Sequence, residues 1–101
     1  HGELVSRDKD SAYLHVTGTK HRDCQYLQID SYYTTPAGML RDANESRTDL
    51  LPIDGASKPV GPFDIGVWRI FPVSGASSVQ LYVEHSCAGR LVVTKIAEVA
   101  L

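Results

Sequence analysis

The chain has 101 residues, of which 43% are hydrophobic and 22% charged, and its formal net charge at pH 7 is −2. A chain of this length and composition forms one domain, residues 1–101, which excludes a disordered chain. The slightly acidic balance argues against a nucleic-acid-binding surface. No apolar run reaches the roughly 18 residues that a transmembrane helix needs. A signal or anchor upstream of these residues is left open.

Alternation of apolar and polar residues dominates the chain, and this pattern predicts β-strands. In chain order, the segments with this pattern or with many β-formers are 3–6, 12–19, 24–35, 65–73, 79–87 and 91–94. The clearest is 79–87, whose inward face includes His85 and ends in Cys87. In 24–35, Leu27 and Ile29 are expected to point inward. The C-terminal segment Val92–Leu101 fits a strand or a helix, and its β-branched residues favour the strand.

Short strands about every 8–12 residues, separated by turn residues, predict an all-β fold. We expect a small antiparallel β-sandwich of about seven strands, immunoglobulin-like or related. The polar segment Asn44–Ser46 is expected to be a loop tip. Segment 50–62 contains Pro52, Pro59 and Pro62. It is therefore expected to form a long surface loop, because proline interrupts central strands.

The chain has two cysteines, Cys24 and Cys87, and neither lies in a CxxC motif or a Cys/His cluster. This spacing favours a structural disulfide, with two buried free thiols or functional thiols as alternatives. Cys24 is out of alternation with the core positions that follow it, so it begins its strand or lies at a bulge. If the disulfide forms, the protein is extracytoplasmic: periplasmic, secreted or on a surface.

The two cysteines and the single tryptophan resemble those of immunoglobulin domains. In that family the tryptophan follows the first cysteine closely and packs on the disulfide. Here Trp68 lies far from Cys24 and nearer to Cys87. The resemblance therefore extends only to a sandwich-like fold.

Four tyrosines are expected on the polar faces of their strands: Tyr13, Tyr26, Tyr32 and Tyr82. Tyrosine combines a large rigid contact area with a polar tip, which suits recognition of a protein or glycan partner. Alternatively, these rings form cross-strand pairs that stabilise an exposed sheet face.

The amino terminus, His1, offers an amine and an imidazole, a pair of nitrogens suited to Cu(II). His1 and Leu4 are similar to the opening of small periplasmic copper-resistance β-sandwiches. Lys9 and Asp10 stand where that family has proline, and Met39 is the only methionine. Whether His1 is a mature terminus or the remnant of a purification tag is open. A periplasmic copper-binding protein is thus the alternative function; otherwise no cofactor is expected.

No nucleophile, nucleotide-loop or complete metal motif occurs in the sequence. The basic run Lys20-His21-Arg22 is interpreted as a solvated turn, and His85 as a hydrogen-bonded, half-buried side chain. A small hydrolase would need a cleft where His85 or His15 meets a carboxylate. The preferred hypothesis is a non-enzymatic, extracytoplasmic binding or assembly module, such as a surface or virion component or a membrane-anchored ectodomain.

Overall fold

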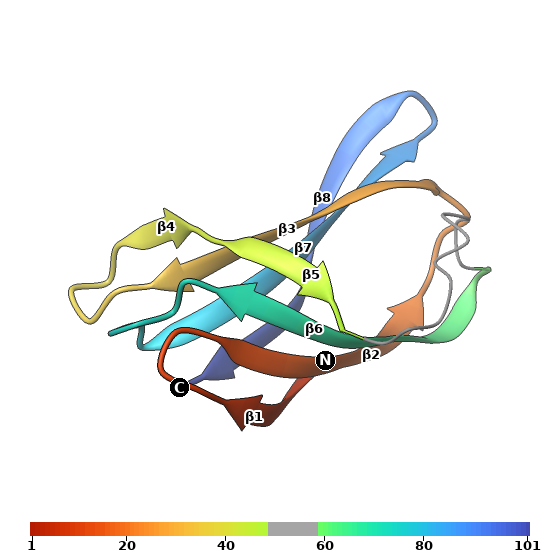
Figure 1. Ribbon diagram of the computed structural model, residues 1–101. Coiled ribbons are helices and arrows are strands. Elements are labelled where there is room, and N and C mark those ends of the chain that lie inside the picture. The colour runs from red at the N-terminus through yellow and green to blue at the C-terminus, as the bar shows by residue number, and fades with distance from the viewer. Residues whose placement is uncertain (49–58) are drawn as a thin grey trace.

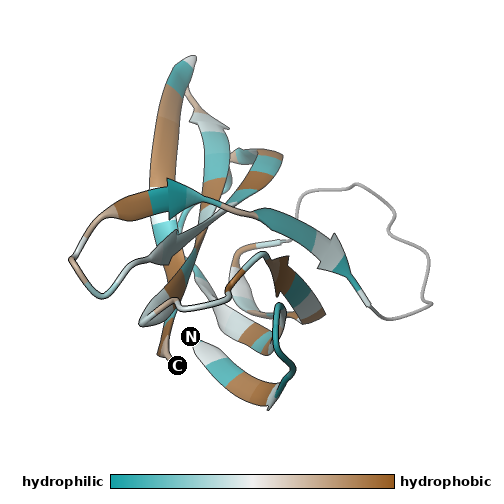
Figure 2. Ribbon diagram, turned by 60° about the vertical axis from the view of Figure 1, so that its left-hand side comes forward, coloured by the Kyte–Doolittle hydropathy of each residue, from teal (hydrophilic) through white to brown (hydrophobic). Residues whose placement is uncertain are grey.

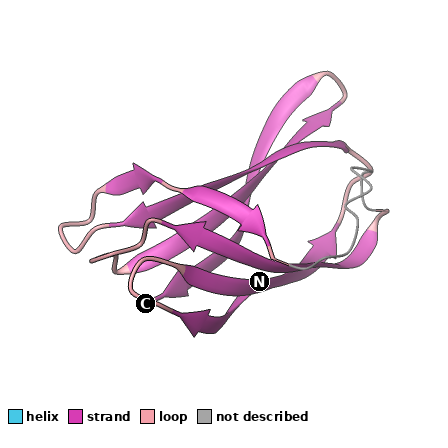
Figure 3. Cartoon of the chain, in the orientation of Figure 1, coloured by secondary structure: helices cyan, strands magenta, loops and turns pink. Residues whose placement is uncertain are grey.

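The computed structural model describes residues 1–48 and 59–101, and this part of the chain contains eight β-strands and no helix (Figure 3). In chain order the strands are β1 (Gly2–Arg7), β2 (Ala12–Lys20), β3 (Gln25–Thr34), β4 (Leu40–Asp42), β5 (Asn44–Arg47), β6 (Gly61–Phe71), β7 (Ser78–Cys87) and β8 (Arg90–Ala100). The prediction of an all-β chain is confirmed. The ambiguous C-terminal segment is a strand, β8, as favoured.

The strands form two antiparallel sheets that pack together as a sandwich (Figure 1). Sheet A has the strand order β1-β2-β6-β5, and sheet B has the order β4-β3-β7-β8. The predicted small antiparallel β-sandwich is therefore confirmed, with eight strands in place of about seven.

The two sheets are joined along both edges. On one side the chain passes from β4 in sheet B to β5 in sheet A, with only Ala43 between these strands. On the other side the amino group of His1 donates hydrogen bonds to the carbonyl oxygens of Thr17 and Ile96, at 2.7 and 2.6 Å. Thr17 belongs to sheet A and Ile96 to sheet B. The two sheets are therefore linked at both edges.

Asn44–Ser46 was expected to be a loop tip, and this prediction is wrong because the segment lies in β5 and pairs with β6. Ser31 of β3 donates a hydrogen bond from its hydroxyl to the Glu45 carboxylate at 2.6 Å. A polar edge strand is stabilised by backbone pairing and bonds of this kind. It therefore lacks the apolar alternation by which strands are recognised in sequence.

The predicted proline-rich loop at 50–62 is only partly described. Residues 50–58 lie outside the described residues. Gly61 and Pro62 are not in a loop, because they begin β6, where Pro62 pairs with Thr19. Proline is tolerated near the start of a strand, where fewer ladder hydrogen bonds depend on it.

The hydrophobic core fills one half of the space between the sheets. Its largest fully buried side chains are Leu14, Ile70, Leu81, Val16, Val73 and Val79. They come from the inward faces of β2, β6 and β7 and from the turn after β6. The period-two alternation therefore placed the core residues of β2 and β7 correctly.

A β-bulge in β3 changes which residues face the interior. The pairing with β7 shifts between Tyr26 and Gln28, which leaves Leu27 as the extra residue. One extra residue reverses the alternation. As a result Leu27 is 46% exposed, Tyr26 lies opposite the inward-facing His85, and Cys24 is buried. The expectations that Leu27 points inward and Tyr26 outward are wrong for this reason.

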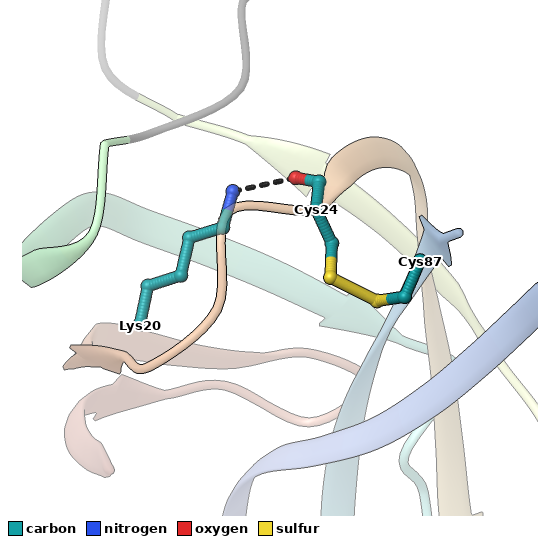
Figure 4. The surroundings of a disulfide bond; sticks show 3 residues. All are labelled: Lys20, Cys24 and Cys87. Carbon is teal, nitrogen blue, oxygen red and sulfur yellow. Dashed lines mark hydrogen bonds between the residues drawn. A yellow bond between two sulfur atoms is a disulfide. The ribbon is translucent and has the colours of Figure 1, made fainter.

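Cys24 and Cys87 form the predicted disulfide, with their Cα atoms 4.8 Å apart (Figure 4). Because Gln25 pairs with Ser86, the bridge continues the β3–β7 ladder by one position and lies within sheet B. The ammonium group of Lys20 donates a hydrogen bond to the carbonyl oxygen of Cys24 at 2.7 Å. The β2–β3 connection is thereby held at the end of the sandwich.

Candidate functional site

A cavity of about 530 Å³ lies between the two sheets at the end that carries the disulfide. In Figures 1 and 2 the hairpin of β7 and β8 projects away from β2 and β6 at this end. Sheet A lines the cavity with Arg47, Phe63, Ile65 and Trp68. Sheet B lines it with Tyr26, Ile29, Val83, His85, Val92 and Ile96. Lys20 adds to the lining from the end of β2, and the β2–β3 connection adds His21, Arg22 and Cys24.

Local packing positions two aromatic walls of the cavity. Gly18 of β2 lies opposite Phe63 of β6, and a Cβ atom at Gly18 would meet the Phe63 ring at 2.5 Å. The phenyl ring therefore lies against the backbone of β2 and forms one wall of the cavity. The indole nitrogen of Trp68 donates a hydrogen bond to the carbonyl oxygen of Ile65 at 3.0 Å, which orients a second aromatic wall.

Basic side chains line this apolar space. Lys20 at the end of β2, His21 and Arg22 on the β2–β3 connection, Arg47 on β5 and the histidine His85 on β7 are among its lining residues. Among the residues of ranges 1–48 and 59–101, no aspartate or glutamate lines it. The basic run interpreted as a solvated turn is exposed at His21 and Arg22, and it also forms part of the cavity wall.

Tyr26 and His85 face each other inside the cavity. Their rings meet edge to face, with centroids 6.4 Å apart. Burial lowers the pKa of His85, and the nearby charge of Lys20 lowers it further. Burial also raises the pKa of Tyr26, with smaller contributions from the carboxylates of Glu45 and Asp30. The imidazole of His85 is therefore kept neutral to a lower pH than a free histidine.

The other predicted tyrosines lie elsewhere. Tyr32 and Tyr82 meet on the outer face of sheet B, with ring centroids 5.4 Å apart and an interplanar angle of 83°. Tyr13 points outward from sheet A and is half-buried. The structure therefore brings Tyr32 and Tyr82 together and places Tyr26 in the cavity. A T-shaped ring pair of this kind stabilises a sheet face, which was the alternative interpretation.

Beside this tyrosine pair, Gln28 hydrogen-bonds to two carboxylates, those of Asp30 and Glu84. The pKa of Asp30 is raised to about 6 by burial and by the neighbouring carboxylate of Glu84. The pKa of Glu84 is lowered by hydrogen bonds from Asp30 and Gln28. The two carboxyl groups therefore titrate as a pair, and the raised pKa of Asp30 indicates that the pair holds a proton up to about pH 6.

Among residues 1–48 and 59–101, one histidine side chain meets a carboxylate, the contact that a hydrolase would need. Nε2 of His15 lies 2.8 Å from a carboxylate oxygen of Asp64. A backbone hydrogen bond from Gly66 lowers the pKa of Asp64, and the hydrogen bond with His15 lowers it further. This pair is on the outer face of sheet A, with the two side chains 38% and 58% exposed, and it does not line the cavity.

The amino group of His1, a predicted copper ligand, donates its hydrogen bonds to two backbone carbonyls. The part of the chain that the structure describes contains no group of three or more His, Cys, Asp or Glu residues arranged for a metal ion. The copper site at His1 stays a prediction.

Sequence reasoning missed Phe63, Trp68 and Arg47 as candidate site residues. Trp68 was recognised only as the centre of a strand. The one usable signal was Gly18 within a strand, since glycine there often marks a close approach of another group. Pairing between β2 and β6 then decides which group approaches.

Within residues 1–48 and 59–101 no helix is long and apolar enough to cross a membrane. Comparison with family models, curated proteins and solved structures finds no match for this chain.

Proposed function

We propose that this chain is a non-enzymatic binding domain whose ligand occupies the cavity between the sheets. The observation that carries the proposal is the cavity itself, with its volume of about 530 Å³ and its aromatic and basic lining. Ligand sites in proteins are usually apolar hollows of about 300–1,000 Å³ with a few polar groups that orient the ligand. The cavity has this size and composition.

The disulfide supports an extracytoplasmic location: the periplasm, a cell surface or the secreted fraction. Disulfides persist in oxidising compartments and are rare in the cytosol. Both cysteines line the cavity, and the bridge holds the β2–β3 connection beside β7. Mass spectrometry with and without reductant tests the location. Two free thiols in protein purified from an oxidising compartment would contradict it.

The strand order supports an immunoglobulin-like relationship. We letter β1, β2, β3, β5, β6, β7 and β8 as A to G and treat β4 as an additional strand beside C. Sheet A then has the order A-B-E-D, and sheet B has the core C-F-G. The disulfide position differs, because it joins β3 and β7 within one sheet. In immunoglobulin domains the bridge joins strands B and F of opposite sheets. We therefore propose an immunoglobulin-like strand order with a disulfide of its own.

Two neighbouring valines of β8 provide a matched test of the cavity. Val92 lines the cavity, whereas Val93 is 53% exposed on the other face of the strand. We expect Val92→Phe to fill part of the cavity and to weaken binding of the neutral dye Nile red about tenfold, which corresponds to about 1.4 kcal/mol. The control Val93→Phe should leave the affinity within about twofold of the wild type.

Binding is measured by dye fluorescence, and urea unfolding checks that both variants are folded. Equal dye affinity in the two variants would contradict a site between the sheets.

A further inference from the structure

We infer that the ligand of this cavity is an uncharged aromatic compound with a hydroxyl group, and that the imidazole of His85 binds this hydroxyl. The inference rests on the proposed function, because it names the class of ligand for the same site. Three features of the cavity carry it: the position of His85, the state of the other polar side chains in the lining, and the aromatic walls.

His85 lies in the middle of the wall that sheet B forms. It pairs with Tyr26 of β3 on one side and with Val92 of β8 on the other, and all three residues line the cavity. The side chain of His85 is half-buried. A ligand that fills the space between the sheets therefore contacts this imidazole.

The ring nitrogens of His85 form no hydrogen bond with any of residues 1–48 and 59–101. The ring meets that of Tyr26 edge to face, with 6.4 Å between the centroids, which is a contact between rings and not a hydrogen bond. The hydrogen bond that the sequence led us to expect for this histidine is therefore not made within the described residues. A half-buried polar group of this kind is stabilised when a ligand supplies the missing partner.

The other half-buried polar side chains that line the cavity, among the described residues, are already engaged. Lys20 and the Trp68 indole each donate a hydrogen bond to a backbone carbonyl oxygen. Tyr26 and Arg47 each have a partner as well. The basic residues of the lining therefore do not select the charge of a ligand, whereas His85 has hydrogen-bonding capacity to spare.

A hydroxyl group is a partner that a neutral imidazole binds in either of its tautomers. Burial lowers the pKa of His85, and the charge of Lys20 lowers it further, so the neutral ring predominates at pH 7. One nitrogen of a neutral imidazole donates and the other accepts, and a hydroxyl can do both. It therefore binds whichever nitrogen faces the cavity. The same burial disfavours a charged group beside His85, because a charge loses its hydration there.

The walls around His85 favour a ligand with an aromatic body. Phe63 and Trp68 line the cavity from sheet A, and the Tyr26 ring lines it from sheet B. Aromatic rings attract one another beyond the effect of the area that they bury. The cavity volume of about 530 Å³ is more than three times that of an engineered cavity of about 150 Å³ that takes one benzene molecule. A body of about two or three fused rings therefore fits this space.

The test uses four ligands that share one bicyclic frame: 2-naphthol, 2-methylnaphthalene, decahydro-2-naphthol and 2-naphthoate. Equilibrium dialysis against the oxidised protein at neutral pH gives the dissociation constant of each ligand, measured below its solubility limit. We expect 2-naphthol to bind about threefold more tightly than its saturated analogue, because only the aromatic frame interacts with the ring walls. It should bind about fivefold more tightly than 2-naphthoate, whose charge must be desolvated.

Variants of His85 assign the hydrogen bond to this residue. His85→Phe keeps a ring in place and removes both nitrogens. The affinity for 2-naphthol should therefore fall about fivefold, as expected for one neutral hydrogen bond, while the affinity for 2-methylnaphthalene changes less than about twofold. The conservative variant His85→Gln retains a donor and an acceptor, so it should keep the affinity for 2-naphthol within about twofold of the wild type.

The matched control is His15→Phe, because His15 lies on the outer face of sheet A and does not line the cavity. It should change neither affinity by more than about twofold. Urea unfolding checks that each variant is folded. If His85→Phe does not fold, His85→Leu takes its place with the same expectation.

The outcomes separate the inference from the proposed function. A loss of 2-naphthol affinity in His85→Phe that is no larger than the loss for 2-methylnaphthalene would overturn the role of His85. Tighter binding of 2-naphthoate than of 2-naphthol would overturn the uncharged class, and equal binding of the saturated analogue would overturn the aromatic class. Each of these results leaves the proposed binding site intact. Binding of none of the four ligands, together with no effect of Val92→Phe on dye binding, would overturn both.

Discussion

The loss of stability on removal of the Cys24–Cys87 bridge can be calculated from the positions of the two cysteines in the chain. The two cysteines are 63 residues apart in sequence, so the bridge closes a loop that holds most of the chain. In the chain-entropy relation, a loop of this length restricts the unfolded state by about 4 kcal/mol at 25 °C. Small domains are stable by only about 5–15 kcal/mol. We therefore expect the double variant Cys24→Ala/Cys87→Ala to lose about 4 kcal/mol of its free energy of unfolding.

The assay is equilibrium unfolding in urea, followed by Trp68 fluorescence, for the oxidised wild type and the double variant. The control is Gln25→Ala with Ser86→Ala, because these residues form the next pair of the same ladder without a covalent bond. The control should lose less than about 1 kcal/mol, as expected for a cross-strand contact. A loss below about 1 kcal/mol in the cysteine variant would refute the reasoning, because the bridge would then not restrict the unfolded chain as assumed.

Three further predictions concern the core, the cavity wall and the carboxylate pair. Leu14→Ala in the fully buried core should lower the free energy of unfolding by about 3–5 kcal/mol in the same urea assay. Gly18→Val places a side chain where the Phe63 ring lies, 2.5 Å from the Cβ position. We expect the free energy of unfolding to fall by about 1–3 kcal/mol and Nile red to bind more weakly. Unchanged dye affinity would contradict the assignment of Phe63 to the cavity wall. The pKa of Asp30 is about 6, above its ordinary value of 3.8, so the stability contributed by this group is present below pH 3.8 and lost as the pH rises through about 6. Asp30→Asn cannot ionise, so its free energy of unfolding relative to the wild type should be higher at pH 7.5 than at pH 4. The same difference in free energy at both pH values would argue against a proton shared with Glu84.

Alternation in the sequence was sufficient for the long strands and for the residues that face the core. Leu14 and Val16 in β2, and Val79 and Leu81 in β7, are buried as the period of two required. The same rule failed at Leu27 because a bulge shifts the alternation by one residue. In the sequence, a bulge was indicated only as one of two explanations for Cys24 being out of alternation, and its position at Leu27 was not. The bulge lies between two stretches of β3 that both pair with β7, so it depends on the register of the two strands.

The polar edge strands β4 and β5 could not be recognised from sequence for a different reason. Their backbone groups pair with β3 and β6, but most of their side chains are exposed, so no apolar pattern is needed. Selection for a buried face is what produces alternation, and an edge segment with little buried surface carries little of it.

The sequence by itself predicted an all-β domain and favoured a disulfide between its two cysteines, because hydrophobic alternation and cysteine count are local properties. Only the tertiary structure decided that the sheets enclose the cavity proposed as the ligand site. The cavity depends on Gly18 facing Phe63, on Tyr26 turned inward by a bulge, and on cations from β2, β5 and their loops meeting at one end of two sheets. These residues are distant in sequence, and strand register alone brings them together. The two cysteines of the predicted disulfide also line this cavity, a placement that the sequence did not reveal.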